Sequence, residues 1–169
     1  RKLALSGGSI ASETVLATIG LDSIQDVEIA ANGDYFVVDT TTLYRIGRHS
    51  GAITVWDTDT YPGLFNALAL DIEANTLWAV TFGDVGESSV LLEYDLASGP
   101  GSGATLFTFG ASSSIPSANT GLDDDGNGIL YLSGFGYDPV GATVHRYDTG
   151  TGSMSAVPGA PFSPVGDVW

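Results

Sequence analysis

Three apolar stretches, each with an aromatic residue at its second position, repeat along the chain. They are Tyr35–Val38, Leu77–Val80 and Leu130–Ser133, and their aromatic residues are Phe36, Trp78 and Tyr131. The aromatic residues lie 42 and 53 residues apart. Repetition at this interval constrains the fold more than any other feature of the sequence, because it indicates one supersecondary unit that is used several times.

The segments around each aromatic stretch repeat as well. A turn rich in Asn, Asp or Gly precedes each stretch, and such residues tolerate the positive φ angles of tight hairpins. An apolar segment lies before that turn. A third segment follows the aromatic stretch, and this third segment ends in Ser-Gly or Thr-Gly, as at Ser50-Gly51 and Ser98-Gly99. A fourth segment follows, for example Ile53–Trp56. Each unit is therefore predicted to contain four antiparallel strands.

Units of four strands at this spacing predict an all-β fold of the β-propeller type, in which each unit is one blade. The predicted blades span residues 24–57, 66–109 and 118–157 of the 169-residue chain, which makes a single domain. Residues 13–19 are predicted to form an outer strand and residues 165–169 an inner strand, each without a partner in the chain. Since four to eight blades close a propeller, we expect either part of a longer propeller or several copies that complete one another.

Two of the repeats carry an Asp four residues before the Gly of the outer turn, in Asp95–Gly99 and Asp148–Gly152. With this Asp-x-x-Ser/Thr-Gly hairpin, residues 24–157 resemble secreted bacterial β-propeller repeat proteins of the NHL-like, YVTN-like and quinoprotein-like kinds. The resemblance implies the architecture but no single activity, because such propellers include lyases, lactonases, dehydrogenases and binding scaffolds. The Gly-Trp docking signature of quinoprotein repeats is absent from the sequence, so no quinone cofactor is implied.

Composition excludes several classes of partner. The chain has 20 acidic and 5 basic residues and a net charge of −15, so no basic patch could neutralise nucleic-acid phosphates. The same charge repels an anionic membrane surface, and no apolar run approaches the roughly 18–20 residues of a spanning helix. Without cysteine, any metal would be bound by oxygen. The acidic, Lys-poor and cysteine-free composition favours secretion, to the extracellular space or to a periplasm.

Two groups of carboxylates are candidate metal ligands. Asp123, Asp125 and Asn127 resemble the front half of a calcium loop, which has oxygen ligands at alternate positions, although the bidentate Glu of such loops is missing. The alternative is that these residues form a hairpin turn. The second group lies on predicted loops of the opposite face, where its members could bind calcium or magnesium or could be solvated turn residues. It includes Asp26, Asp84 and Asp138.

Aromatic residues in the predicted loops are candidate ligand contacts. Rings flanked by Gly and Pro suit a rigid, exposed platform on which a sugar or a peptide could stack. The alternative is that the rings pack over the edges of the blades. The candidates are Tyr61, Phe65, Phe135 and Tyr137.

No catalytic motif stands out in the sequence. It contains no Gly-x-Ser-x-Gly elbow, phosphate loop or His-Glu-x-x-His segment, and neither histidine lies beside a suitable nucleophile. These absences favour a non-catalytic, secreted scaffold that binds a protein or glycan ligand and that assembles through its terminal strands, as a homo-oligomer or within a longer propeller. A calcium- or magnesium-dependent lyase or lactonase and a carbohydrate-binding module stay open as alternatives. The predicted cofactor is accordingly none, or calcium.

Overall fold

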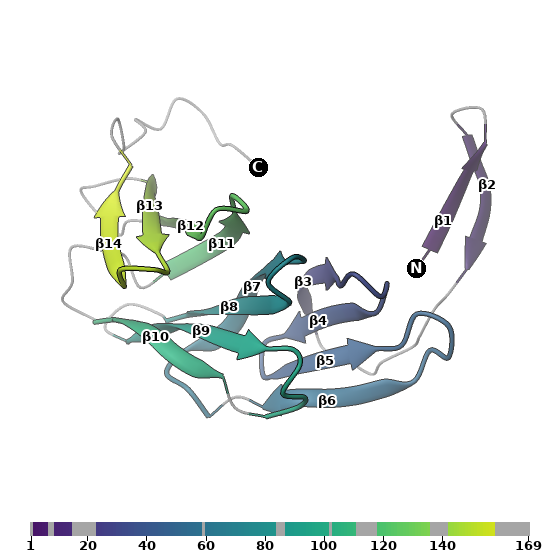
Figure 1. Cartoon of the computed structure of the whole chain (residues 1–169), viewed down its shortest axis with the longest axis horizontal. Helices are drawn as coiled ribbons and strands as arrows, with labels where there is room; N and C mark the ends of the chain where they lie inside the picture. Colours follow the sequence, from purple (N-terminus) through teal and green to yellow (C-terminus); the bar gives the residue numbers. More distant parts are fainter. Residues whose placement is uncertain are drawn as a thin grey trace.

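The computed structural model describes residues 2–6, 9–14, 23–58, 60–83, 87–101, 103–110, 118–135 and 142–157, and its regular elements are all β-strands (Figure 1). An N-terminal antiparallel hairpin consists of β1 (Lys2–Ser6) and β2 (Ser9–Thr14). The remaining strands form three antiparallel sheets of four strands each. Within the described ranges, no helix is long and apolar enough to cross a membrane.

Each sheet is a meander, because its strands lie side by side in the order of the sequence. The first sheet contains β3 (Ile24–Ile29), β4 (Tyr35–Asp39), β5 (Thr42–Ile46) and β6 (Ile53–Thr58). The second sheet contains β7 (Leu64–Asp71), β8 (Thr76–Phe82), β9 (Ser89–Asp95) and β10 (Ala104–Phe109). The third sheet contains β11 (Ala118–Asp124), β12 (Ile129–Phe135), β13 (Ala142–Asp148) and β14 (Ser153–Ala156).

The predicted turn chemistry explains why the strands reverse where they do. Gly33, between β3 and β4, has a φ of +81°, and Asn75, in the equivalent turn of the second sheet, has a φ of 55°. Both angles lie in the left-handed region, which only Gly and, to a lesser degree, Asn and Asp occupy without large strain. The turns rich in Asn, Asp and Gly therefore define the hairpins locally, before any contact between sheets.

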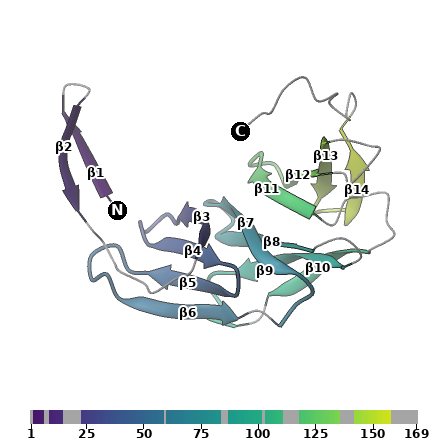
Figure 2. The same cartoon turned by 180° about the vertical axis from the view of Figure 1, so that it is seen from behind.

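The three sheets stack face against face in chain order, as Figures 1 and 2 show from opposite sides. We call the face of a sheet that points to the next sheet in the chain its forward face, and the other its backward face. Because side chains alternate along a strand, each cross-strand row of residues belongs to one face. The forward row of the first sheet is Glu28, Phe36, Arg45 and Thr54.

Two hydrophobic clusters fill the spaces between the sheets. The first joins Phe36 and Val38 on the forward face of the first sheet to Leu77 and Leu92 on the backward face of the second. The second cluster joins Trp78 on the forward face of the second sheet to the backward face of the third, at Leu130, Leu132 and Tyr147. The apolar strands of the sequence are therefore buried mainly by contact between neighbouring sheets, which holds the stack together.

The three aligned aromatic residues occupy the same place in their sheets, on the second strand and on the forward face. Phe36 is 2% exposed and Trp78 is 4% exposed, since another sheet covers each of them. Tyr131 is 37% exposed, because no further sheet lies over it in the described part of the chain. The repeat seen in the sequence is therefore a repeat of packing position.

The ends of the chain differ from the three sheets. The sequence predicts a lone outer strand at residues 13–19, and of these the structure describes residues 13 and 14, which end β2. Strand β2 pairs with β1, which the sequence pattern does not reveal. The hairpin stands apart from the second and third sheets, beyond the first (Figure 1). The inner strand predicted at residues 165–169 lies outside the described residues.

Candidate functional site

The backward face of the first sheet is apolar, and no sheet covers it in the part of the chain that the structure describes. Its two rows contain eight residues, none of them charged: Val27, Val37, Tyr44 and Val55, and Ile29, Tyr35, Ile46 and Ile53. The four aliphatic residues on the two edge strands β3 and β6, Val27, Ile29, Ile53 and Val55, are between 42% and 53% exposed, whereas Val37 and Ile46 on the central strands are buried. Contiguous exposed apolar surface of this kind is uncommon on soluble proteins, and it often marks an interaction site.

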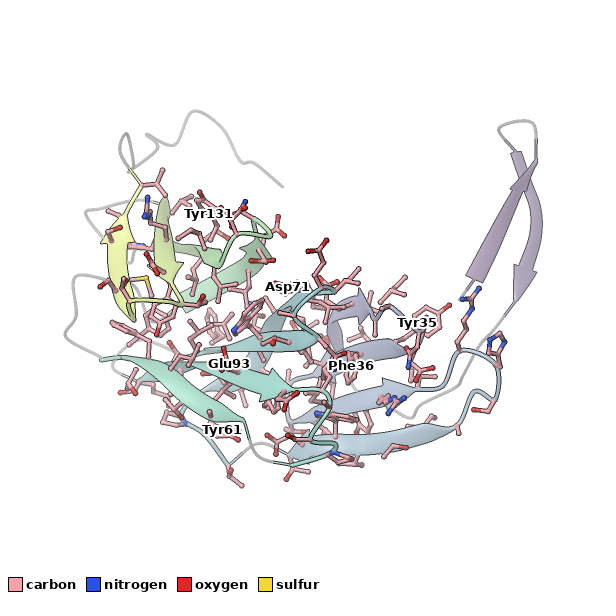
Figure 3. All side chains as sticks on the ribbon, viewed as in Figure 1. Tyr35, Phe36, Tyr61, Asp71, Glu93 and Tyr131 are labelled. Atoms are coloured by element: carbon pink, nitrogen blue, oxygen red, sulfur yellow. The ribbon has the colours of Figure 1, made fainter. Side chains whose placement is uncertain are left out.

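The backward faces of the other two sheets each pack against the preceding sheet. In the second sheet, Leu77, Leu92 and Tyr94 lie on the backward face and are at most 4% exposed against the first sheet. In the third sheet, Leu130 and Tyr147 are buried in the same way against the second. Figure 3 shows the neighbours Tyr35 and Phe36 on opposite sides of the first sheet, with Phe36 on the side of the second sheet. The backward face of the first sheet thus has the character of a sheet–sheet contact, but among the described residues no sheet lies against it.

The forward face of the third sheet is the other face of the stack on which the described residues place no sheet. Its row across the four strands is Asp123, Tyr131, Arg146 and Ser155. The corresponding row of the first sheet is Glu28, Phe36, Arg45 and Thr54, so both rows read acid, aromatic, Arg and hydroxyl in the same order. In the first sheet, this row lies on the face that packs against the second sheet. The second sheet differs, with Ala69, Trp78, Glu93 and Ala104.

The aromatic candidates within the described residues lie in the packed structure. Phe65 is 1% exposed and belongs to the cluster between the first and second sheets, because it sits on inner strand β7 and not on a loop. Tyr61 is half-buried against that cluster, with its ring centre 6.2 Å from that of Phe65. These two rings therefore pack within the structure, which is the alternative to ligand contact that the sequence leaves open. Phe135 ends β12, but its side chain, like all of Tyr137, lies outside the described residues.

A buried carboxylate, Asp57, organises the space around Tyr61. Its Oδ2 accepts hydrogen bonds from the hydroxyls of Tyr61 and Tyr94, both at 2.9 Å, and from the Gly103 N–H at 3.2 Å. Asp57 is the penultimate residue of β6 in the first sheet, whereas Tyr94 lies on β9 of the second sheet and Gly103 directly precedes β10. Burial, and next the charge of Asp57, raise the pKa of Tyr94 well above its ordinary value. This cluster therefore links the two sheets with Tyr94 as a permanent donor.

The proposed calcium segment forms the turn between β11 and β12. Asp125 Oδ1 accepts hydrogen bonds from the N–H groups of Asn127 (2.8 Å) and Ile129 (3.1 Å), and Asp124 Oδ2 accepts one from Gly126 (3.0 Å). This is the chemistry of a hairpin turn, in which Asp satisfies the backbone two residues on. The hairpin-turn alternative accounts for these contacts, and calcium binding there stays a prediction.

The second group of metal candidates is described only at Asp26. Its Oδ2 accepts a hydrogen bond from the Leu68 N–H at 2.9 Å, which joins the first sheet to the second, while Asp84 and Asp138 lie outside the described residues. Among the residues whose placement the structure gives, no three His, Asp or Glu side chains are grouped to hold a metal ion.

Three acidic groups of the inner strands influence one another electrostatically. The pKa of Glu28 is raised, mainly by burial and then by the charges of Asp26 and Asp123. Asp26 and Glu28 belong to β3 and Asp123 to β11, so inner strands of the first and third sheets contribute to one acidic region. Ionisation of Glu28 in this acidic region therefore costs free energy in the folded state. The stability of the protein should depend on pH for this reason.

Comparison with known proteins gives the architecture. No family model matches the chain, and no curated protein matches its sequence. Among solved structures, the chain is similar to one from the nidogen/laminin complex, with a TM-score of 0.70 at 14% identity. It is also similar to an auxiliary nutrient binding protein from Bacteroides ovatus (0.63, 16%) and to a gluconolactonase from Xanthomonas campestris (0.55, 16%).

The three sheets are blades of a β-propeller. These matches cover 88% to 91% of the chain, so the predicted all-β fold with three four-stranded units is confirmed. The chain spans 56%, 35% and 52% of the nidogen/laminin, nutrient-binding and gluconolactonase chains. At these identities the likeness concerns the fold alone, and it does not distinguish NHL-like, YVTN-like and quinoprotein-like repeats.

Sequence reasoning misses the uncovered backward face, although a signal for it exists. Strand β4 has four consecutive apolar residues, Tyr35, Phe36, Val37 and Val38, which lie alternately on its two faces. A strand that is apolar on both faces predicts cover on both sides. Applied to each repeat in turn, this rule identifies the first sheet as one that needs a neighbour before it.

Proposed function

We propose that the protein is a secreted, non-catalytic β-propeller scaffold that acts by protein–protein contact, and that its first partner is a second copy of itself. In this arrangement the forward face of the third sheet packs on the backward face of the first sheet of the other copy. The observation that carries the proposal is the charge-free, 42–53% exposed surface formed by Val27, Ile29, Ile53 and Val55.

The choice of a second copy follows from the internal repeat. The acid–aromatic–Arg–hydroxyl row on the third sheet matches the row by which the first sheet already seats a backward face. Tyr131 takes the place of Phe36, and Arg146 that of Arg45. Both halves of the contact are therefore present on one chain and point in opposite directions along the stack.

A contact between two different faces propagates unless it closes. Two copies would each use both faces and would bring together six blades, a number within the usual range for closed propellers. If the angle between sheets prevents closure after two copies, the same contact gives longer head-to-tail chains. Either assembly buries the apolar surface that a single copy leaves in water.

The charge of the chain makes this association dependent on salt. Each copy carries a net charge of −15, so two copies repel each other at low ionic strength. Salt at about 0.1 M screens exposed charges beyond about 10 Å. We therefore expect association to strengthen as salt is added, whereas an assembly held by ion pairs would weaken.

Native mass measured over about 1–100 µM protein tests the proposal, because affinities in this range report contacts of moderate strength. We expect a concentration-dependent species of two or more copies. Val27→Asp and Tyr131→Asp each place a charge in the contact and should yield single copies that remain folded by circular dichroism. Ile72→Asp is the matched control, since Ile72 is 55% exposed in the turn between β7 and β8, away from both faces.

A mixture of the two variants separates contact between unlike faces from contact between like faces. Each variant retains one intact face, so an equal mixture of Val27→Asp and Tyr131→Asp should recover a two-copy species through the single undamaged contact. A chain that stays a single copy at every concentration and salt level overturns the proposal. Equal loss of association in Ile72→Asp would also overturn it, because the contact would then not lie on the two faces.

A further inference from the structure

A pocket lies at the rim of the first and second sheets, on the forward side of the first sheet and apart from the two apolar and outward faces of the proposed assembly. Its volume is about 370 Å³, and its wall comes mainly from the turn between β5 and β6 together with Asp34, Trp56 and Pro100. A second cavity of about 150 Å³ shares Arg45 and Trp56 with it. Pro100 comes from the outer turn of the second sheet, so both sheets contribute to the lining.

The pocket concentrates positive charge in a strongly acidic protein. Of the five basic residues in the chain, Arg45 and Arg48 line this pocket, and His49 lies beside them. Asp34 is the one carboxylate of the lining. Two Arg side chains against one Asp give the wall about one net positive charge, in a chain whose total is −15.

Asp34 is committed to the turn and to Arg45. Its Oδ2 accepts a hydrogen bond from Arg45 Nε at 2.8 Å, and its Oδ1 accepts one from the Arg48 backbone N–H at 2.9 Å. That backbone hydrogen bond, with the nearby Arg45, holds the pKa of Asp34 below its ordinary value. Arg45 is further fixed over the ring of Trp56, 5.7 Å from its centre. The Asp34–Arg45 pair is therefore a neutral, rigid part of the wall.

The guanidinium of Arg48 is the second cation of the pocket wall, beside the paired Arg45. It has no ion pair among the described residues, because Asp34 receives only the backbone N–H of Arg48. Its side chain nevertheless lies in a defined place, over Gly33, where a Cβ atom would collide with the Cδ of Arg48. A glycine that makes room for one Arg side chain positions its charge at the pocket.

The buried indole of Trp56 forms part of the same wall. Trp56 is 3% exposed and lines both cavities, and its Nε1 has no hydrogen-bond partner in the described structure. A buried donor without a partner is rare and costly. Because Trp56 lines the pocket, a molecule bound there would change the surroundings of this indole.

The geometry points to a binding site for a small organic carboxylate, in which Arg48 holds the carboxylate and His49 and Thr54 face the polar part of the ligand. A single negative charge matches the single net positive charge of the wall. A doubly charged phosphate fits less well, because the remaining acidic protein repels the second charge. Ala52, Pro100 and the edge of Trp56 provide an apolar side for a ring or a short carbon chain. This site does not depend on the assembly proposed above.

Titration of the ¹⁵N-labelled protein with glucuronate tests the site, with glucose as the uncharged analogue and inorganic phosphate as the doubly charged one. We expect glucuronate to shift the Trp56 indole signal and the amide signals of residues 47–52, and glucose and phosphate to bind at least tenfold more weakly. Loss of one charge-assisted contact weakens binding by about tenfold or more. Arg48→Gln should therefore reduce glucuronate affinity by that factor, and Arg48→Lys should retain part of it.

Thr108→Glu is the matched control, since it changes the net charge by the same amount on exposed strand β10. It should leave the affinity for glucuronate within about twofold, because its charge is remote from the pocket and screened. Equal weakening by Arg48→Gln and Thr108→Glu would overturn the site in favour of a general charge effect. Equal binding of glucose, tighter binding of phosphate, or no shift at residues 47–52 would overturn it as well.

Discussion

Replacement of Asp57 by Asn tests the link between the first two sheets. The carboxylate is buried, and its Oδ2 accepts three hydrogen bonds, from Tyr61, Tyr94 and the Gly103 N–H. A hydrogen bond to a charged group contributes about 1.5–3 kcal/mol, against about 0.5–1.5 kcal/mol for a neutral pair. Removing the charge while keeping the shape therefore costs about 1 kcal/mol for each bond, or about 2–3 kcal/mol in total. At this chain length that corresponds to a fall in Tm of roughly 5–10 °C.

Urea unfolding followed by tryptophan fluorescence measures this loss. Tyr94→Phe removes one of the same bonds, so the double variant Asp57→Asn/Tyr94→Phe should lose about 1 kcal/mol less than the sum of the single losses. Tyr44→Phe is the control, because the Tyr44 hydroxyl lies 3.5 Å from Asp39 and contributes little. Additive losses, or a Tyr94→Phe variant no less stable than Tyr44→Phe, would refute the reasoning that Asp57 acts as a shared charged acceptor.

The remaining predictions concern acidic residues of the inner strands and turns. The pKa of Glu28 is raised, so the folded state binds more protons than the unfolded state above the ordinary value of 4.5, and its stability falls as the pH rises through that window. Glu28→Gln should therefore be more stable than the parent at pH 7 and equal to it at pH 4 in urea unfolding, and a Gln variant without benefit at pH 7 would contradict this. Asp125→Ala removes the acceptor of two backbone N–H groups and should lose about 1–2 kcal/mol equally with calcium and with EDTA, whereas a loss seen only with calcium would favour a bound ion.

The fold could be predicted from the sequence because its determinants are local and repeat. Gly33 and Asn75 carry positive φ angles in the first two inner hairpins, and the aromatic positions Phe36, Trp78 and Tyr131 define one strand and one face in all three sheets. Repetition adds what a single unit lacks, since three agreeing copies fix the register of each strand. Strand β1 has no such support, because its pattern occurs once.

The functional residues are harder to predict because their partners are remote in the sequence. Asp57 meets Tyr94 and Gly103, which are 37 and 46 residues away, and Asp26 meets Leu68, which is 42 residues away. Nothing in the local sequence distinguishes these carboxylates from solvated turn residues. The sequence predicts Phe65 on a loop, but β7 begins at Leu64, which places the ring of Phe65 in the core. The boundary of a strand thus decides whether a ring is surface or core.

The acidic composition has a structural cause that changes where function should be sought. Asp39, Asp71 and Asp95 each accept backbone N–H groups in the turn that follows a strand. A repeat with many tight turns therefore accumulates Asp without needing a binding site for a cation. Charge patterns alone are then poor guides to function in this chain. The informative positions are those that depart from the repeat. Among the described residues, no sheet lies against the backward face of the first sheet, and Arg48 has no acidic partner. Both features belong to the first sheet. A protein partner would bury the apolar face, and an anionic ligand would pair with the guanidinium of Arg48.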